Sequence, residues 1–589
     1  MRFAEFIEAL NRAEATASRL ETAAVLSEAL GKLGEADLRF AVNFLLGQLG
    51  PPFEAPPVGM GDKFAVKAIA AVAGRPEAAI AARMREVGDL GVVAEEVVTA
   101  SRQTTLDARS ATFDEVRRHV ADISRASGKG ANDRRVGLLK GLLAGCSPAE
   151  AKYVVRFVVG KMRIGIGEGQ LLEAVATMAG DRKRKPELED AYNRHPDLAD
   201  LAVRVKAGGF EAVRHTEVTP FVPMRPMLAE RLKSLEEVRA KLGGRMALDY
   251  KYDGLRMQIH YRGGDVRVFS RNLEPYTDQF PDLVDEVKAR AKARSFIMEG
   301  EGVIVNLETG ELRPFREASR RRGRKYGMEA AMEEYPLAVF LFDCMYLDGK
   351  DLTGLPLLER RVAMLAAINP SERLQPSTLS VVEDDHAAQA FFMAALGAGC
   401  EGVIAKSLGP DSAYRAGARG WAWIKFKRDY SATLSDTLDL VVVGAFAGRG
   451  RRTGRYGSLL MAAYDEESDT WVSVCKLASG FNDEELRELD GRLRPLALPG
   501  PPARVESGLV PDTWLEPRVV AEVRGAELTL SPVHRAAWGA LSPDAGLALR
   551  FPRFEKWRDD KGAKDTTTTA ELVSMYRRQF EKAQGPAPA

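Results

Sequence analysis

Cysteine and histidine are both scarce in this chain. Its four cysteines, Cys146, Cys344, Cys400 and Cys475, lie far apart in 589 residues, and its six histidines do not cluster. A disulfide framework needs paired cysteines, and a structural zinc site needs closely spaced cysteine or histidine ligands. Neither is therefore indicated, and we expect the cysteines to fill core positions.

Long apolar segments are also absent. The chain has no run of about eighteen apolar residues, the length that spans a bilayer. The N-terminal stretch MRFAEFIEALNRAEA is charged and helix-like, unlike a signal peptide. We therefore expect no membrane partner and a cytoplasmic protein, associated with the nucleoid if the source is prokaryotic.

An excess of charge of either sign is missing as well. The 84 basic and 83 acidic side chains leave a formal net charge of +1. Any contact with nucleic acid must then come from local basic surfaces. What the chain does have is 45% hydrophobic and 28% charged residues, which is typical of a soluble globular protein, and enough length for several domains.

Helical patterns dominate residues 1–215, which we predict to be an all-α domain. One buried helix face is indicated by the spacing of Ala151, Val154, Val155, Val158 and Val159. Glycine-bearing breaks at 127–133 and 163–169 expose backbone amides beside basic side chains. Such breaks could bind phosphates or be solvated turns between helices, and the sequence leaves both open.

A different pattern follows the segment 219–230, whose three prolines indicate an extended connection. Residues 216–430 are predicted to form an α+β domain, with helical runs at 281–294 and 385–398. Its strand candidates are MQIHYRG, DVRVFSR, SFIMEGEGVIV, LAVFLFDCMYL and EGVIAKS. Residues 431–580 consist of short strands with few helices, which favours a small β-barrel, and 581–589 are expected to be a disordered tail.

The sequence KYDGLR at 251–256 contains the strongest candidate for chemistry. Apolar residues alternate with polar ones over 246–251, so a strand would place Lys251 on its polar face, and Gly254 would then permit a bend. A lysine attacks phosphorus only as the neutral amine, so a catalytic lysine needs neighbours that lower its pKa. A solvated surface lysine is the commoner case for so short a motif.

Carboxylates and cations occur near the ends of other predicted strands. Glu301 and Glu401 could hold Mg²⁺, because this ion takes only one or two protein carboxylates together with phosphate oxygens and water. In WIKFKRDY a period of two places Lys425 and Lys427 on one face. These lysines could neutralise a triphosphate and lower the pKa of Lys251 by repulsion, or simply be a basic edge strand.

An ordered series of motifs resembles the ATP-dependent DNA ligases of the covalent nucleotidyltransferase superfamily over nearly the whole chain. LDYKYDGLR looks like the adenylation motif, and RFPRFEKWRDDK at 550–561 looks like the terminal motif of the barrel domain. The motifs between them are SRNLEPYT, FIMEGEGVI, LFDCMYLDG, EGVIAKS and WIKFKRDY. The resemblance implies a helical DNA-binding domain, an adenylation domain and a C-terminal OB-fold. The basic run at 316–327 has no match, and we expect a solvated loop or a nonspecific phosphate contact there.

The resemblance also implies roles for individual residues. Lys251 would form the covalent lysyl-AMP, Arg256 and Arg271 would contact the ribose and phosphate, and Glu301 would bind ribose or metal. Phe342 would stack on adenine. Further expected contacts are made by Glu401 at a metal and by Arg419, Lys425 and Lys427 at or near the nucleotide phosphates. Asp249 stands where the family usually has glutamate, so its contact with adenine is less directly implied. Glu299 replaces a common aspartate and is given no role.

Groups of the barrel motif are expected to reach the nucleotide only when the barrel closes. Arg553, Arg558 and Lys561 would then orient pyrophosphate, and Arg550 with Phe551 resembles a pair that presses into the minor groove at a nick. The implied cofactors are ATP and Mg²⁺. The implied partner is nicked duplex DNA, encircled by a monomer with flexible joins near 215 and 430.

Two alternatives remain. An RNA ligase or mRNA capping enzyme would share the lysine chemistry, but the helical first third resembles a DNA-clamping domain and disfavours both. A catalytically inactive nucleic-acid-binding homologue is the other alternative, and the intact Lys251, Glu301, Glu401 and Lys425 argue against it. An NAD-dependent ligase is disfavoured because the cysteine-ligated zinc module expected there is absent.

Overall fold

The computed structural model describes most of residues 1–581. The residues that it leaves undescribed are 56, 103–109, 233, 306–311, 314, 322–326, 411, 428–436, 449–454, 526, 532, 551 and 582–589. Two compact units result, one of Met1–Ala81 with Leu90–Lys427 and one of Ala82–Asp89 with Arg428–Ala589. In the part of the chain that the structure describes, no helix is both long and apolar enough to cross a membrane. The boundary expected near 430 and nearly all of the tail lie outside the described residues.

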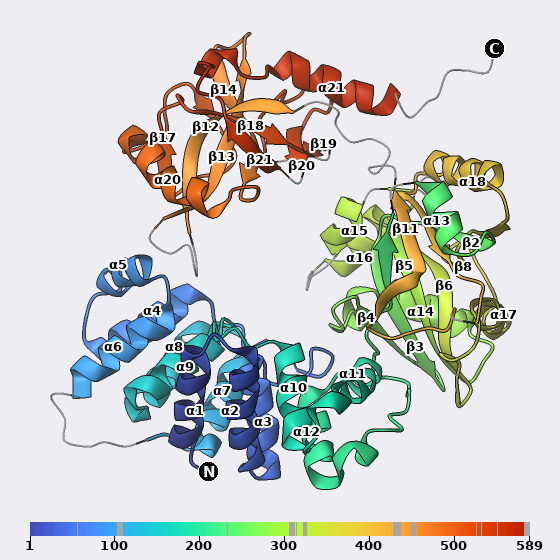
Figure 1. Cartoon of the computed structure of the whole chain (residues 1–589), viewed down its shortest axis with the longest axis horizontal. Helices are drawn as coiled ribbons and strands as arrows, with labels where there is room; N and C mark the ends of the chain where they lie inside the picture. The colour runs from blue at the N-terminus through green and yellow to red at the C-terminus, as the bar shows by residue number, and fades with distance from the viewer. Residues whose placement is uncertain are drawn as a thin grey trace. The chain divides into compact units, whose positions relative to one another are not determined.

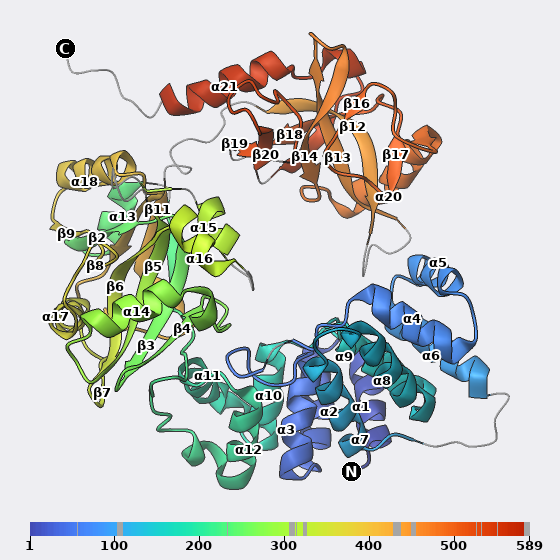
Figure 2. The same cartoon turned by 180° about the vertical axis from the view of Figure 1, so that it is seen from behind.

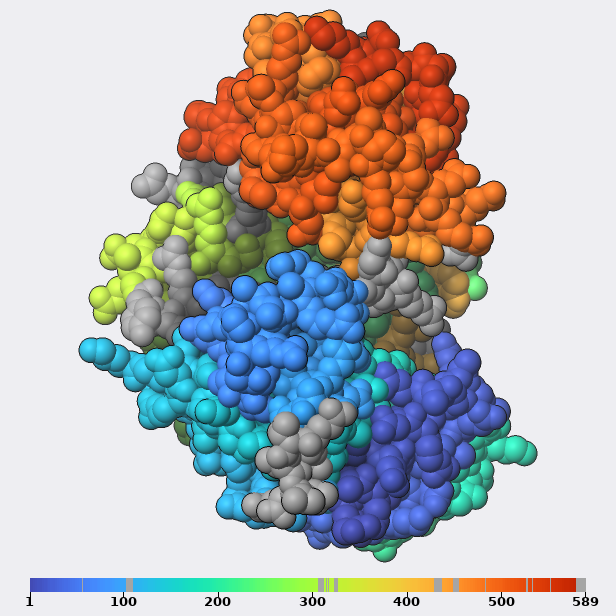
Figure 3. Space-filling view, turned by 90° about the vertical axis from the view of Figure 1, so that its left-hand side faces the viewer, coloured from blue at the N-terminus to red at the C-terminus, as the bar shows by residue number. Residues whose placement is uncertain are grey.

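The N-terminal region is helical, as predicted (Figure 1, blue to blue-green; Figure 2 shows it from behind). Its helices are α1 (Phe3–Ala15), α2 (Arg19–Gly31), α3 (Glu35–Leu45), α4 (Asp62–Ala73), α5 (Glu77–Val87), α6 (Leu90–Arg102), α7 (Phe113–Arg125), α8 (Ala131–Gly145), α9 (Pro148–Val158), α10 (Glu168–Met178), α11 (Lys185–Arg194) and α12 (Leu198–Gly208). The predicted breaks begin in the turns before α8 and α10. Figure 3 shows the surface that the first of these helices present, in blue and cyan.

Helix α9 is buried more completely than its sequence pattern predicts. Besides the expected aliphatic face, Tyr153, Arg156 and Phe157 are buried. Buried polar groups need partners, and Glu14 of α1 supplies one. Its carboxylate lies 3.0 Å from Arg156 and 2.8 Å from Lys152, and the Tyr153 hydroxyl donates to it at 2.7 Å. The prediction of a single buried face was therefore incomplete, because a polar cluster lets the other faces be buried too.

The Glu14 cluster should make folding stability depend on acid. Burial opposes ionisation, but hydrogen bonds from Arg156, Lys152 and Tyr153 outweigh it and lower the pKa of Glu14 to about 2. A carboxyl with a depressed pKa stabilises the fold above its unfolded pKa near 4.3, and that contribution is lost as pH falls towards 2. We expect Glu14→Gln to remove about 2 kcal/mol of stability at pH 7, allowing for solvent screening, and less at pH 3. Urea unfolding between pH 7 and 3 measures this.

Glu28→Gln is the matched control for that experiment. Glu28 pairs with Lys32 at 2.6 Å on the exposed surface of α2, where such pairs contribute little. Its unfolding curve should follow the wild type at each pH. If the free energies of unfolding of Glu14→Gln and of the wild type change by the same amount between pH 7 and pH 3, the Glu14 cluster has no pH-linked role in stability.

The region after residue 227 is an α+β fold, as predicted. It contains two mixed sheets in which most strand pairs are antiparallel. The strand order of the first sheet is β1 (Leu228–Arg231), β11 (Arg419–Lys427), β10 (Gly402–Lys406), β2 (Met246–Lys251) and β9 (Leu379–Val382). That of the second is β4 (Asp265–Ser270), β3 (Leu255–Arg262), β5 (Ser295–Ile304), β6 (Leu337–Leu347) and β7 (Lys350–Asp351), with β8 (Leu374–Pro376) beside β6. Its helices are α13 (Leu235–Lys241), α14 (Pro281–Arg290), α15 (Phe315–Arg321), α16 (Met328–Glu334), α17 (Leu357–Ala367) and α18 (Asp385–Gly397).

The predicted connection before β1 is extended, but it is packed against the second sheet. Met224 and Met227 are buried, and the Gln258 side chain exchanges hydrogen bonds with the backbone of Met224 at 2.9 and 3.1 Å. Arg225 pairs with Glu168 of α10 at 2.6 Å. These contacts attach the connection to the second sheet and to α10. They argue against the flexible join expected near residue 215.

The solvated loop expected in the basic run at 316–327 is wrong for residues 316–321, and the alternative of a phosphate contact there stays a prediction. Residues 316–321 are the body of α15 rather than a loop, and 322–326 lie outside the described residues. Arg321 is fully buried, pairs with Asp282 at 2.6 Å and lies 4.8 Å from the ring centre of Phe280. The many arginines in this run suggested a solvated segment, but the charge of Arg321 is neutralised inside the fold by Asp282.

The C-terminal unit is β-rich, which confirms the predicted barrel class. Its sheet runs β15 (Ala497–Leu498), β17 (Thr513–Leu515), β12 (Leu438–Ala447), β13 (Tyr456–Asp465), β14 (Thr470–Leu477) and β16 (Val505–Glu506), with β18 (Val520–Arg524) and β21 (Arg553–Trp557) attached to β12. Strands β19 (Glu527–Ser531) and β20 (Gly546–Arg550) form a hairpin-like pair, and the helices are α20 (Asp483–Leu493) and α21 (Thr569–Glu581). Because β12 pairs with β13, β17 and β18, the sheet curls around one apolar core.

Candidate active site

A cavity of about 360 Å³ lies between the two sheets of the α+β fold. Strands β2, β10 and β11 of the first sheet contribute Asp249, Lys251, Lys406, Arg419, Trp423 and Lys425 to its wall. Strands β3, β5 and β6 of the second sheet contribute Arg256, Glu301 and Phe342. The end of β4 and the turn after it add Ser270, Arg271 and Asn272. Residues far apart in sequence therefore converge because two separate sheets face one space.

Strand β2 ends at Lys251, which lines the cavity together with Asp249. Burial along the strand does not alternate as the sequence pattern predicts, because Met246, Ala247, Leu248 and Asp249 are all buried. Gly254 follows in a bend, but the structure gives a reason other than bending freedom. A Cβ there would lie 2.4 Å from the carbonyl oxygen of Gly302, so glycine is required by the close approach of β5.

The Lys251 amine is held by a carboxylate rather than left in open solvent. Its Nζ lies 2.5 Å from Glu401 Oε2, and Lys427 Nζ lies 2.6 Å from the same oxygen. Burial opposes ionisation of Glu401, but Lys251 and its hydrogen-bond donors outweigh this and lower the pKa of Glu401 to about 2. The sequence predicted cations around Lys251, and the structure adds an acid that joins two of them.

Two further acids beside Lys251 are shifted the other way. Burial raises the pKa of Glu301 to about 7, although Lys251 and Arg256 act to lower it. Burial and the neighbouring Glu401 raise the pKa of Asp253 to about 6. A bound cation would favour the ionised form of both carboxyls, so this part of the site could accommodate one.

Burial lowers the pKa of Lys425, and repulsion from Arg419, Lys427, Lys251 and Arg271 adds to this effect. This set of five basic side chains defines a positive wall. Such a wall suits a ligand with several phosphates.

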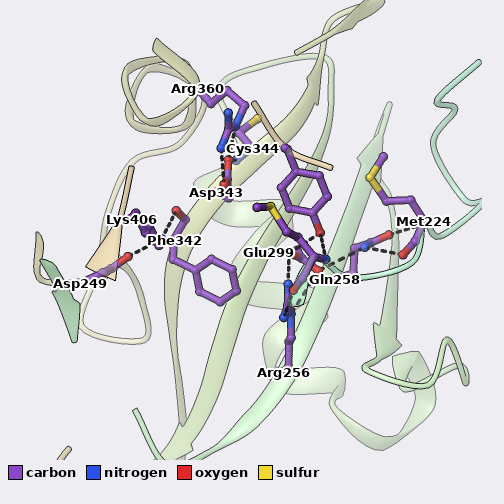
Figure 4. A network of polar contacts seen from close by, with 12 residues as sticks. Met224, Asp249, Arg256, Gln258, Glu299, Phe342, Asp343, Cys344, Arg360 and Lys406 are labelled. Carbon is purple, nitrogen blue, oxygen red and sulfur yellow. Dashed lines mark hydrogen bonds and ion pairs between the residues drawn. The ribbon is translucent and has the colours of Figure 1, made fainter. Parts of the chain in front are cut away.

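Arg256 is fixed by a buried network behind the cavity (Figure 4). Its Nη2 lies 2.6 Å from Glu299 Oε2, and its Nη1 donates to the carbonyl of Met227 at 2.8 Å. Glu299 also accepts from the Tyr414 hydroxyl at 2.8 Å. Glu299, which the motif resemblance left without a role, thus holds the guanidinium in place.

Phe342 of β6 precedes a buried ion pair in the chain and contacts a second aromatic ring. The neighbouring Asp343 pairs with Arg360 of α17 through hydrogen bonds of 2.7 and 2.8 Å, and both side chains are fully buried (Figure 4). The Phe342 ring lies 6.0 Å from that of Trp423 in an edge contact. Phe342 therefore presents a ring in a restrained position to the cavity.

Most of the predicted residues of the α+β region converge on this cavity. Those that line it are Asp249, Lys251, Arg256, Arg271, Glu301, Phe342, Arg419 and Lys425. Glu401 and Lys427 join it through their ion pairs. The sequence missed Asp253, Lys406, Tyr414 and Trp423. Lys406 could have been found, because a period of two in EGVIAKS places it on the same strand face as Ile404, another lining residue.

The predicted barrel residues belong to the C-terminal unit. Arg558 and Lys561 both pair with Asp439 of β12, at 2.9 and 2.6 Å. Arg553 begins β21 and Arg550 ends β20, while Phe551 lies outside the described residues. Their predicted approach to the nucleotide and DNA stays a prediction.

The chain combines a helical region, an α+β region that holds a lysine-bearing cavity and a β-rich C-terminal unit, and these are the parts of a covalent nucleotidyltransferase. Residues 2–176 match the family model "DNA ligase N terminus", 226–427 match "ATP dependent DNA ligase domain" and 452–561 match "ATP dependent DNA ligase C terminal region". The chain is 42% identical to a DNA ligase of Thermoplasma volcanium over 98% of each chain. It is 43% identical to one of Pyrobaculum arsenaticum over 99% of this chain and all of that one. The chain belongs to the ATP-dependent DNA ligase family.

The fold has a counterpart among solved structures. A structure titled "Pmar-Lig_Pre." is similar with a TM-score of 0.55 and 18% identity, covering 94% of this chain and 99% of that chain. At that identity the likeness concerns the fold alone.

Proposed function

We propose that this ligase seals nicks in duplex DNA through a lysyl-AMP at Lys251. The observation that carries the proposal is that Lys251 shares one cavity with a wall of basic side chains and a cluster of carboxyls. In the first step, neutral Lys251 Nζ attacks the α-phosphorus of ATP, the bond to the β-phosphate oxygen breaks, and pyrophosphate leaves. The AMP then passes to the 5′-phosphate at the nick, and the 3′-hydroxyl displaces it. Catalysis of such transfers is mostly positioning and charge stabilisation.

The cavity offers a group for each part of the nucleotide. Phe342 would stack on the base, and the restrained guanidinium of Arg256 would contact the ribose or α-phosphate together with Arg271. Lys425, Arg419 and Lys427 would neutralise the phosphates. Glu401 pairs with both Lys251 and Lys427, and its release from Lys251 would accompany the attack.

The carboxyls fit the divalent cation expected in this family. The described residues contain no group of three or more acidic, histidine or cysteine side chains set to hold a metal ion. Mg²⁺ does not need one, because it binds one or two carboxylates and completes its shell with water and phosphate oxygens. Glu301 and Glu401 would hold it, and the ion would supply charge neutralisation at the phosphates.

The proposed setting is a cytoplasmic monomer that encircles nicked DNA. The helical region and the C-terminal unit would contact the duplex, with Arg550 and Phe551 in the minor groove and Arg553, Arg558 and Lys561 reaching the nucleotide on closure. Arg558 and Lys561 would have to leave Asp439 to do so. The domain limits proposed for this arrangement are 1–215, 216–430 and 431–580.

A nick-sealing assay tests the proposed function. Duplexes with a nick in DNA or in RNA are incubated with ATP, GTP or NAD supplied separately. We expect sealing of nicked DNA with ATP. Sealing only of RNA would favour an RNA ligase, and binding of nicked DNA without any enzyme-AMP would favour an inactive homologue.

We expect Phe342→Ala to weaken the binding of ATP more than it slows the chemical step. Stacking of a base on an aromatic ring contributes about 1–3 kcal/mol, so the KM for ATP in enzyme-AMP formation should rise roughly 5- to 150-fold. Phe342→Tyr keeps the ring and should stay near wild type. An unchanged KM in Phe342→Ala would remove the ring from the base site.

A further inference from the structure

A tight turn at residues 416–417 leads into β11 and so into the cavity. Arg419, the first residue of this strand, lines the cavity and belongs to its positive wall. Among the described residues no carboxylate pairs with the Arg419 guanidinium, so no partner side chain holds it in place. The direction in which Arg419 enters the cavity therefore depends on the backbone that precedes it.

The chain just before β1 holds this turn through backbone hydrogen bonds. The amide of Gly417 donates to the carbonyl of Arg225 at 3.1 Å. The carbonyl of Ala418 accepts a hydrogen bond from the amide of Leu228 at 2.9 Å. The turn therefore takes its position from Arg225 and the residues that follow it.

Arg225 is itself held by the helical region. Its Nη2 lies 2.6 Å from Glu168 at the start of α10, and its guanidinium carbon lies 5.0 Å from the ring centre of Tyr192 in α11. Tyr192 is almost fully buried, and its hydroxyl donates to the Glu168 carboxylate at 2.8 Å. The backbone amide of Arg225 donates to the carbonyl of Asn193 at 2.9 Å. One residue thus joins two helices of the helical region to the turn before β11.

The helical region also contacts the turn directly. Gly417 has a φ of +67°, and a Cβ at this position would collide with the side-chain amide of Asn193. A larger residue would therefore strain the backbone and push α11 away from the turn. Glycine is required here because the two regions approach each other closely, two residues before Arg419.

We propose that Arg225 is a positioning residue through which the helical region orients Arg419 towards the phosphates of ATP. The helical region thus serves the first step, which needs no DNA, in addition to contacting the duplex. Displacing a positioned group by about 1 Å can slow a reaction about a hundredfold, so a contact outside the cavity can matter for the chemistry. This inference rests on the proposed function, because it assigns the helical region a part in forming the lysyl-AMP.

The test measures enzyme-AMP formation by the full chain, with ATP labelled at the α-phosphate and no DNA present. Arg225→Met removes the contacts with Glu168 and Tyr192. We expect it to raise the KM for ATP roughly tenfold and to change kcat less than about threefold, because Arg419 is displaced while Lys251 is not. Weaker binding of a duplex cannot cause this change when the reaction contains no DNA.

Arg194→Gln is the matched control. Arg194 ends α11 and pairs with Asp351 of β7 at 2.8 Å, so this variant also breaks an ion pair between the helical and α+β regions. It leaves the turn before β11 untouched. Because the pair is partly exposed and contributes little, the KM for ATP should stay within about twofold of the wild type.

A double variant shows whether Arg225 acts through Arg419. Arg419→Ala should itself raise the KM for ATP, because it removes a contact with the phosphates. Adding Arg225→Met to Arg419→Ala should then change the KM by less than about twofold, since the group that Arg225 positions is already gone.

A second pair of variants approaches the same contact from the turn. Gly417→Ala should raise the KM for ATP, because its methyl group collides with Asn193. Adding Asn193→Ala removes the colliding atoms and should recover part of the loss, although the strained φ remains. Recovery through a change in α11 requires that the helical region acts on the turn.

Each outcome decides the matter. An unchanged KM in Arg225→Met would overturn the inference, and so would an equal rise in Arg194→Gln, because any loosening of α11 would then have the same effect. Equal losses from Arg225→Met with and without the Arg419 side chain would also overturn it. Absence of covalent label in the wild type would instead contradict the proposed function.

Discussion

Lys251→Ala should abolish formation of the enzyme-AMP adduct, with a loss of at least about a thousandfold in rate. No other group can replace the nitrogen that forms the bond to phosphorus. The fold should survive, because Glu401 keeps its 2.6 Å contact with Lys427. Incubation with ATP labelled at the α-phosphate, followed by denaturing electrophoresis, measures the adduct, and a gel-shift assay measures binding of nicked DNA, which we expect to persist.

Lys427→Ala is the matched control for Lys251→Ala. It also leaves Glu401 with one lysine in place of two, so it imposes a similar electrostatic change without removing the nucleophile. We expect slower labelling that still goes to completion. Equal loss of label in both variants would mean that the charge of the lysine pair, rather than the Lys251 nitrogen, is what the reaction needs.

The largest stability effect is expected at Arg360. Its guanidinium donates to Asp343 at 2.7 and 2.8 Å and to the Leu355 and Ser412 carbonyls at 2.6 and 2.8 Å, with Arg360 and Asp343 fully buried. Arg360→Met leaves the carboxylate of Asp343 without a counter-charge, which costs about 3–5 kcal/mol. The midpoint of thermal unfolding should fall by roughly 10 °C.

Two further variants make the Arg360 result interpretable. Arg290→Met breaks the more exposed pair with Glu286 and should cost less than about 1 kcal/mol. Adding Asp343→Asn to Arg360→Met removes the stranded charge and should recover part of the loss. If Arg360→Met unfolds together with the wild type, the pair does not hold β6 and cannot be the support of Phe342.

The repeating patterns of the sequence predicted most of the elements that build the site. The period of two placed Lys251, Lys425 and Lys427 on strand faces where the structure has them, and the helical runs at 281–294 and 385–398 correspond to α14 and α18. These features were predictable because they depend on neighbouring residues. The family resemblance then identified which polar faces were candidates for the nucleotide.

The supporting pairs could not be predicted in the same way. Asp249 and Lys406 are separated by 157 positions in the chain, so no local pattern joins them. The same holds for Arg321, whose partner Asp282 lies 39 positions earlier and turns an apparent basic loop into a packed helix. Which charges are buried together is decided by the meeting of distant strands and helices, and this appears only in the folded chain.

The site of the covalent adduct tests the central claim most directly. The full chain is incubated with ATP in the absence of DNA, digested, and its peptides are analysed by mass spectrometry. We predict that one AMP is attached, on the peptide that contains Lys251, and that it is released when nicked DNA is added. An adduct on a different lysine, or none under conditions where nicks are sealed, would contradict the account.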